Sequence, residues 1–244
     1  MIKTKRMFVM ILMAVAAAAP IEAQDSESEG WRFEVSPLYL WAVDMGGTMT
    51  VKEQGFPLEV EFADAVDNLQ TAFTVHIEAW KGSWGVLADL YWLDLGGEQM
   101  LPGPIGESFK VDLQQTLAEV AVGYEFDEHA FFIGGVRYVS LETKLTLPLG
   151  NEINPNESWT DAFVGFMWRP PLSKRWTFAS RVDVGAGSSD VVWNAAAALD
   201  FAVSRHVALF FGYRYLSYDY ANDDNGFGYD ISQYGPLAAL RFFW

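Results

Sequence analysis

The last stretch of the chain, residues 207–244, alternates between two chemically different sets of side chains on either side of a polar loop. Phe211 falls on an apolar, aromatic side and Arg214 on the other, while Phe242 and Arg241 divide in the same way. Successive side chains of a strand point to opposite faces, so this period of two predicts a β-hairpin with one apolar face. A final strand with an aromatic face is typical of a closed membrane barrel.

The same alternation recurs upstream, and the segments are connected alternately by a tight turn and by a longer polar loop. Short turns at one end and long loops at the other are typical of outer-membrane barrels. In hydrocarbon every backbone polar group needs a partner, which a sheet provides only by closing on itself. We therefore predict an all-β fold, a transmembrane antiparallel up-and-down β-barrel of about ten strands (range 8–12), whose first and last strands pair. The expected strands are 31–43, 71–80, 84–95, 109–126, 130–146, 158–169, 175–187, 191–203, 207–220 and 229–244.

The first residues have the order of a secretory signal: Lys3, Lys5 and Arg6, then an apolar run, then small residues. This order predicts a signal peptide over residues 1–23, a loose polar segment over 24–30 and the barrel over 31–244. The run is shorter than the ~20 residues that a spanning helix needs, which disfavours the alternative of a membrane anchor. The expected location is therefore the cell outer membrane, reached through the periplasm.

Composition agrees with that assignment. Aromatic residues make up 16% of the chain, which fits strands that face lipid, and there is no cysteine. The formal net charge of −16 becomes −18 once the signal peptide, with its three basic residues and Glu22, is removed. Such a balance disfavours nucleic acid, because phosphate binding draws on clustered Lys and Arg. The expected partners are outer-membrane lipid and lipopolysaccharide, and a monomer is expected.

Large aromatic residues near the segment ends predict belts at the two headgroup levels. These residues are Trp84, Trp92, Tyr124, Phe126, Trp159, Trp168, Trp176, Trp193 and Phe201.

In the first strand, Trp31, Tyr39 and Trp41 are expected on the lipid side, and Pro37 predicts a bulge or kink, since proline cannot donate to the ladder. The long first loop, 44–69, follows. Its TMTV and PLEVEF stretches could pair as a small hairpin. Phe62, Val66 and Leu69 have helical spacing, which predicts a plug that caps or enters the barrel, with simple loop decoration as the alternative.

With the apolar face of each strand assigned to lipid, the opposite face carries acids and arginines in mixture. We expect these charges to meet across the lumen as an ion-pair network. The predicted members are Glu78, Asp89, Glu119, Arg137, Asp161, Arg181, Asp183, Arg214 and Arg241, with Arg32, Glu34, His76 and Asp200 on the same face. The network either fills a narrow barrel with bridged side chains or forms a charged ring that sorts small solutes.

Catalytic chemistry finds little support in the sequence. His76, His129 and His206 are the only histidines, and the last two fall in tight turns. The chain has no Gly-x-Ser-x-Gly elbow, no His-Glu-x-x-His and no cysteine nucleophile. We expect no catalytic residues, no cofactor and no metal site, so the protein is not expected to be an enzyme; an outer-membrane hydrolase is a remote alternative.

Several segments together resemble a family of small outer-membrane β-barrel proteins of Gram-negative bacteria. They include FEVSPLYLWA, HIEAWKGSWGVLADLYWLDL, GGVRYVSLETKL, RVDVGAGSSDVVWNAAAALDF, FGYRYLSYDY and GPLAALRFFW. The resemblance implies an outer-membrane barrel, and it implies no established activity.

Such barrels tend to end on an aromatic residue, so Phe242 and Trp244 are expected to be the signal read by the barrel-assembly machinery. The expected function is an integral outer-membrane barrel with a charge-bridged lumen, with a structural role and/or slow passage of small solutes; the alternative is a selective small-solute channel.

Overall fold

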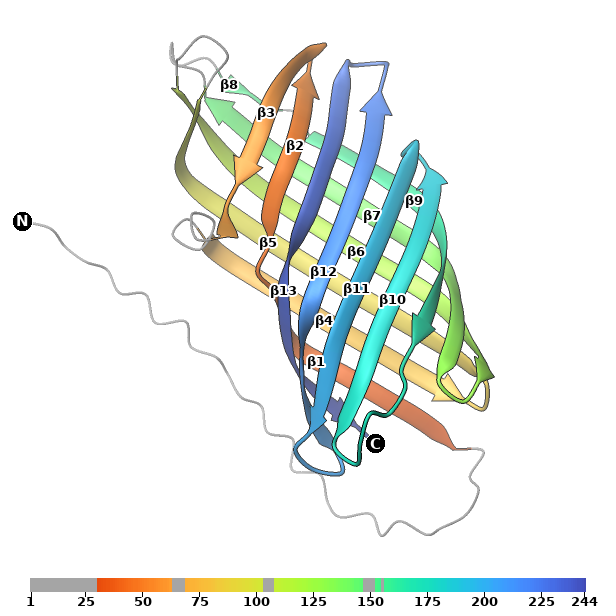
Figure 1. Cartoon of the computed structure of the whole chain (residues 1–244). Coiled ribbons are helices and arrows are strands. Elements are labelled where there is room, and N and C mark those ends of the chain that lie inside the picture. Colours follow the sequence, from red (N-terminus) through yellow and green to blue (C-terminus); the bar gives the residue numbers. More distant parts are fainter. Residues whose placement is uncertain (1–29, 63–68, 103–107, 147–151, 155) are drawn as a thin grey trace, which may run out of the picture.

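The computed structural model describes residues 30–62, 69–102, 108–146, 152–154 and 156–244. The expected signal peptide and nearly all of the segment 24–30 lie outside these residues. The described strands form one sheet (Figure 1). They are β1 (Trp31–Trp41), β2 (Asp44–Val51), β3 (Gln54–Val60), β4 (Leu69–Lys81), β5 (Trp84–Pro102), β6 (Ser108–Asp127), β7 (Ala130–Thr146), β8 (Glu152–Ile153), β9 (Asn156–Trp168), β10 (Trp176–Gly187), β11 (Val191–Ala202), β12 (Val207–Asn222) and β13 (Phe227–Phe243).

Ten of these strands close into an antiparallel barrel, in the order β1-β4-β5-β6-β7-β9-β10-β11-β12-β13, with β13 returning to β1. At the closure, the backbone N–H of Phe33 donates to the carbonyl of Trp244 (2.9 Å), and the reverse bond measures 3.2 Å. The closure supplies hydrogen-bond partners to backbone groups of the first strand, which hydrocarbon cannot provide. The predicted ten-strand up-and-down barrel is confirmed.

The strands β2 and β3 form the hairpin predicted within the first loop. Lys52 and Glu53 make its two-residue turn with φ of 51° and 65°, the left-handed conformation that such turns require. The hairpin lies beside β13, where Asp44–Thr50 pairs with Tyr234–Gly228. Because Trp41 pairs with Leu237 and Asp44 with Tyr234 in one unbroken register, β2 continues the line of β1 along β13.

A one-residue bulge interrupts β1 at Pro37. Val35 pairs with Phe242 but Leu38 pairs with Leu240, so the register shifts by one residue between them. The predicted bulge is therefore present, and it corrects the expected faces of the strand. Because one extra residue reverses the alternation, Tyr39 and Trp41 point toward the lumen instead of lipid.

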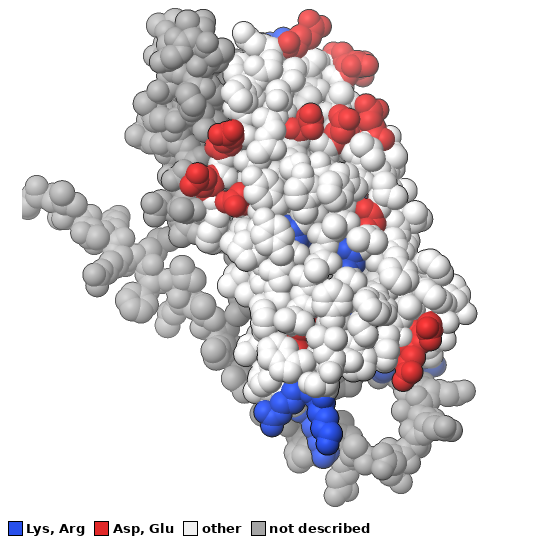
Figure 2. Space-filling model, viewed as in Figure 1, with Lys and Arg blue, Asp and Glu red and all other residues white. Residues whose placement is uncertain are grey.

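The two ends of the barrel differ in charge (Figure 2). The end with the tight turns exposes Lys174, Arg175 and Arg205 as well as the acids Asp127 and Glu128, whereas acidic residues such as Asp223 and Asp224 predominate at the opposite end. Because outer-membrane barrels keep their short turns on the periplasmic side, we assign the end with the tight turns to the periplasm and the opposite end to the exterior.

Between these ends the outer surface is apolar. More than half of the residue surface is exposed at Val164, Val120, Val182 and Phe132, as expected for residues in contact with lipid. Of the aromatic residues predicted at the headgroup levels, Trp84, Tyr124, Phe126, Trp168 and Trp193 are exposed, but the prediction for Trp159 is wrong. That tryptophan is buried and stacks on Tyr220 at 4.3 Å between ring centroids. Among the described residues, no helix is long and apolar enough to cross a bilayer.

Two buried apolar clusters lie inside the lumen. The outer layer occupies the half of the lumen nearer the exterior; it consists of Met45, Met49, Val51, Leu58, Val60, Leu113, Leu117, Val139, Leu141, Trp159, Val192, Leu216, Tyr218, Tyr220, Phe227, Tyr229 and Ile231. The lower layer consists of Trp80, Leu87, Ala121, Phe131, Ile133, Phe163 and Met167. The expectation that apolar side chains belong to the lipid side therefore holds only in part, since a lumen without a continuous water column also buries apolar side chains.

Candidate functional site

A band of charged side chains crosses the lumen, and its central residue is Glu119 on β6. We call this band the charged belt; it consists of Glu34, His76, Glu78, Asp89, Glu119, Arg137, Arg169, Arg181, Asp183, Asp200, Arg214 and Arg241. On β6 the inward positions run from Leu117 in the outer layer through Glu119 to Ala121 in the lower layer. On this side of the barrel the charges are therefore enclosed between apolar layers.

Glu119 accepts hydrogen bonds from three arginines that reach it from three different strands. Arg137 donates from Nε at 2.9 Å, Arg181 from Nη2 at 2.7 Å and Arg214 from Nη2 at 3.0 Å. Asp183 accepts from Arg137 and from Arg181, each at 2.8 Å. Charge-assisted bonds of this length are the strong ones in proteins, and burial keeps water from competing with them.

Asn194 and a pair of aromatic rings complete the surroundings of these arginines. The Asn194 amide donates to Asp183 and its oxygen accepts from Arg214 Nε, both at 2.8 Å. The Arg214 guanidinium also lies over the ring of Trp41, 4.8 Å from its centroid, and over that of Tyr91 at 5.6 Å. Inward rotation of Trp41 at the Pro37 bulge thus supplies a cation–π partner to the belt.

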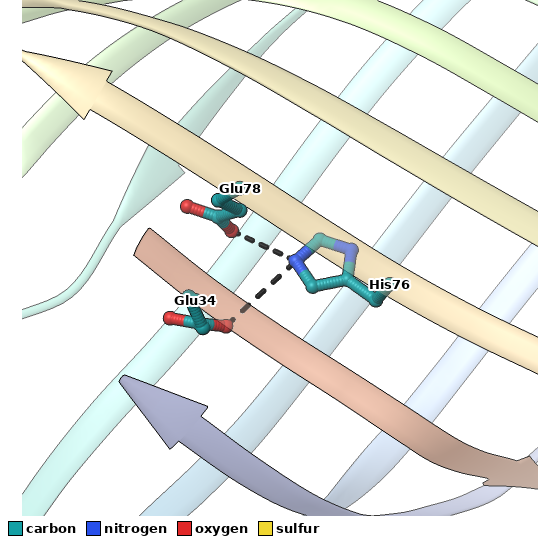
Figure 3. A group of neighbouring side chains, drawn as sticks. All are labelled: Glu34, His76 and Glu78. Carbon is teal, nitrogen blue, oxygen red and sulfur yellow. Dashed lines mark hydrogen bonds and ion pairs between the residues drawn. The ribbon is translucent and has the colours of Figure 1, made fainter. Parts of the chain in front are cut away.

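A second group joins the first through His76 on β4 (Figure 3). The ring Nδ1 lies 2.7 Å from Asp89, and Nε2 lies 2.9 Å from Glu78 and 3.8 Å from Glu34. Ionised carboxylates only accept hydrogen bonds, so these contacts require both ring nitrogens to donate. Neither nitrogen then has a free lone pair to act as a general base.

The carboxylates around His76 are also paired with arginines. Arg169 donates to both oxygens of Glu78, one of them at 3.0 Å, and Arg241 binds Glu34 and reaches Asp200 at 2.6 Å. Six acids of the belt thus face five arginines, and a doubly protonated His76 makes the sum neutral. The belt contains its own counter-ions.

Glu34, His76 and Glu78 bring their ligand atoms within 4.8 Å of one another, a spacing that a metal ion could use. Arg169 and Arg241 already supply positive charge to these oxygens. A divalent cation would have to displace both guanidiniums, so the geometry is better explained as an ion-pair cluster.

The structure brings together most of the residues predicted for the network, but it separates one and adds another. Asp161 accepts from the backbone N–H and the hydroxyl of Ser189, at 2.7 and 2.8 Å, and is stabilised locally outside the belt. Arg169 was missed because it stands at the end of its strand, before Pro170. Counting on by twos from Asp161 places Arg169 on the inward face and would have found it.

Other predicted residues fall at the edges of the barrel. Phe62 is 43% exposed and Leu69 begins β4, whereas Val66 lies outside the described residues, so the plug stays a prediction. Phe242 lies in β13 and pairs with Val35, and the Trp244 ring stacks on Phe33 with centroids 5.9 Å apart. Arg32 lies at the periplasmic rim, where it pairs with Glu125 at 2.7 Å.

A small cavity lies within the belt, with a volume of about 80 Å³. Arg169, Arg181, Arg214 and Arg241 all line it. A site for one water needs roughly 10–15 Å³, so the cavity has room for several water molecules.

No protein-family model matches the chain, and no curated protein matches it in sequence. Solved structures match its shape. The outer membrane protease OmpT of Escherichia coli has a TM-score of 0.50 at 9% identity, over 91% of this chain and 99% of OmpT. The attachment invasion locus protein Ail of Yersinia pestis has a TM-score of 0.39 at 10% identity, over 88% of this chain and 99% of Ail. The closed ten-strand barrel, with its apolar outer surface, has the fold of the outer-membrane β-barrel proteins of Gram-negative bacteria.

Proposed function

We propose that this protein is an outer-membrane barrel closed to solutes, in which the charged belt and the outer layer hold the wall together from within. The observation that carries the proposal is the outer layer, which lies across the lumen above the belt; its members Leu141, Leu216 and Ile231 have no exposed surface. Ions crossing such a layer would lose their hydration, which costs several kcal/mol or more.

Conductance across a planar bilayer tests this proposal. The wild-type protein is expected to insert without conductance steps. A variant lacking residues 44–60 removes Met45, Met49, Val51, Leu58 and Val60 from the outer layer and is expected to conduct if the belt alone cannot seal the lumen. Folding of both proteins is checked by the heat-dependent shift in their migration on a gel. Stepwise conductance by the folded wild type would overturn the proposal.

A narrow path for small solutes is the second candidate. It is favoured by the cavity in the belt, whose lining has four arginines and one acid, Asp89, in a belt that is neutral as a whole. The same bilayer measurement separates the two candidates, because a path through this cavity predicts anion-selective current in the wild type.

We do not extend the protease activity named for OmpT to this chain. His76 has a carboxylate at each ring nitrogen, so it has no position from which to activate a nucleophile or a water molecule. We further propose that the protein is a monomer, that its lipid face contacts outer-membrane lipid and lipopolysaccharide, and that the assembly machinery reads Phe242 and Trp244.

A further inference from the structure

The barrel wall is interrupted where β1 and β4 separate. The two strands pair from Trp31 with Lys81 to Ser36 with His76. Beyond that point the Thr74 hydroxyl stands between them, accepting from the Tyr39 N–H at 3.1 Å and donating to the Tyr39 carbonyl at 2.5 Å. A side chain thus replaces the ladder at the place where the Pro37 bulge redirects β1.

Above this hydroxyl, β2 pairs with β3 and β13, and β4 pairs with β5. Within the described residues no ladder pair joins β4 to β2 or β3. An open stretch in a wall that faces hydrocarbon is costly unless something covers it, because unpaired backbone groups find no water there.

A cavity of about 400 Å³ occupies this interruption, and we call it the wall cavity. Its lining includes side chains from both faces of the wall. Leu40, Pro236 and Ala238 belong to the lipid face, and Leu40 is 60% exposed. Met45 and Leu117 belong to the outer layer and are 4% and 2% exposed. The cavity therefore leads from the lipid side into the lumen.

The wall cavity has the size and chemistry of a site for an apolar chain. An apolar cavity of about 150 Å³ holds benzene, so this one has room for a considerably longer hydrocarbon. Beside Leu93 and Trp92, its lining has two polar atoms that are buried and without a partner in the structure, Tyr91 Oη and Trp41 Nε1. The accessible lining is otherwise mainly apolar, which suits a hydrocarbon chain.

The position of the opening identifies the source of such a molecule. Phe211 pairs with Ala238 in the lipid-facing surface and Tyr213 pairs with Pro236, and these two aromatic side chains are 42% and 50% exposed. Tyr234, stacked on Tyr215 at 5.8 Å, stands two residues nearer the exterior. The opening thus lies within the apolar band, on the periplasmic side of aromatic residues that fit the headgroup level.

We propose that the wall cavity binds one acyl chain of a membrane lipid, which enters from the bilayer between β1 and β4. The chain covers the interruption from the lipid side and lies against Met45 and Leu117. This inference requires only that the barrel stands in a membrane, and it holds whether or not the lumen conducts solutes.

Photolabelling tests the proposal. The folded protein is placed in vesicles of phosphatidylethanolamine and phosphatidylglycerol that contain a phosphatidylethanolamine with a diazirine on one acyl chain. After irradiation, labelled positions are mapped by mass spectrometry. The expected result is label on Met45 and Leu117, which lipid reaches only through the wall. Leu216, buried in the same outer layer but absent from the cavity lining, should stay unlabelled.

Two substitutions provide the matched comparison. Ala72→Phe places a ring in the lining of the cavity and should abolish the label on Leu117. Ala162→Phe puts the same ring on the exposed face of β9 and should leave that label unchanged. Heat-dependent migration on a gel confirms that both variants are folded.

Three outcomes would overturn the proposal. One is the absence of label on Met45 and Leu117 in the wild type. Another is equal labelling of Leu216, which would mean that the whole interior is loose. The third is label on Leu117 only after deletion of residues 63–68, which would assign the cavity to the chain itself. Adding unlabelled oleic acid distinguishes the source of the acyl group: a site that prefers free fatty acid would lose its label at low oleic acid concentration, against the proposal.

Discussion

Replacement of Glu119 by glutamine is the sharpest test of the charged belt. The amide keeps the size of the side chain and removes its charge, so three guanidiniums, from Arg137, Arg181 and Arg214, lose their shared negative partner. Hydrogen bonds to charged groups contribute about 1.5–3 kcal/mol each, against about 0.5–1.5 kcal/mol for neutral ones. The loss over three contacts is therefore about 3 kcal/mol.

An independent comparison gives a similar figure. Removing one partner of a buried ion pair typically costs about 3–5 kcal/mol, because the remaining charge stays buried and uncompensated. Glu119 is 3% exposed and Arg137 is fully buried, so solvent cannot compensate for the change. We expect Glu119→Gln to lower the free energy of unfolding by about 3–4 kcal/mol.

Urea titration of the protein in lipid vesicles, followed by gel migration, measures this change. Glu128→Gln, an exposed carboxylate in a periplasmic turn, is the matched control and should leave the midpoint unchanged. Adding Arg214→Met to Glu119→Gln should cost less than the sum of the two single variants, since it removes one of the surplus charges. A Glu119→Gln midpoint equal to that of the control, or strict additivity in the double variant, would refute the ion-pair account.

Three further changes probe other parts of the wall. Arg137→Leu should lower the temperature at which the gel band shifts, and adding Asp183→Asn to this variant should restore part of the loss. An unchanged transition temperature in the Arg137→Leu variant would contradict the ion-pair account of the belt. Gly235→Ala should lower the urea midpoint, since a Cβ there would lie 1.7 Å from the Ala42 carbonyl oxygen. The control Gly134→Ala, whose Cβ would have its nearest contact at 3.7 Å, should leave the midpoint unchanged. Replacing Lys52 and Glu53 by Asn and Gly should stabilise the protein by about 1 kcal/mol, because it relieves two left-handed residues; a lower urea midpoint would contradict the turn geometry.

Much of this architecture could be predicted from alternation alone. The strand number, the closure of β1 on β13, the hairpin in the first loop and the bulge at Pro37 all follow from local patterns. Alternation identifies two faces of a strand, but it does not say which one meets lipid when both are apolar. Trp159 was assigned to the headgroup level for that reason, although it stacks inside the lumen.

The composition of the belt was harder to derive. Alternation identifies the residues of each strand that face the lumen. Which of them meet across the lumen depends on the shear of the barrel, which one sequence does not reveal. Arg181 reaches Glu119 from three strands away in the sheet, and Asp161 binds Ser189 instead of an arginine. The bulge adds a second difficulty, since its consequence for Tyr39 and Trp41 depends on whether the extra residue lies before or after them.

The unequal lengths of the strands determine how the exterior meets this protein. A strand of about 9–11 residues is enough to cross the membrane. The strands β10 and β11 have 12 residues each, but β5, β6 and β7 have 19, 20 and 17. The strands β12 and β13, with 16 and 17 residues, are also long. Strands on both sides of β10 and β11 can therefore rise well clear of the lipid and form a screen around the mouth, which stays low at β10 and β11. A molecule arriving from the medium would meet the barrel over the low rim of β10 and β11, with the inner surface of the screen facing it.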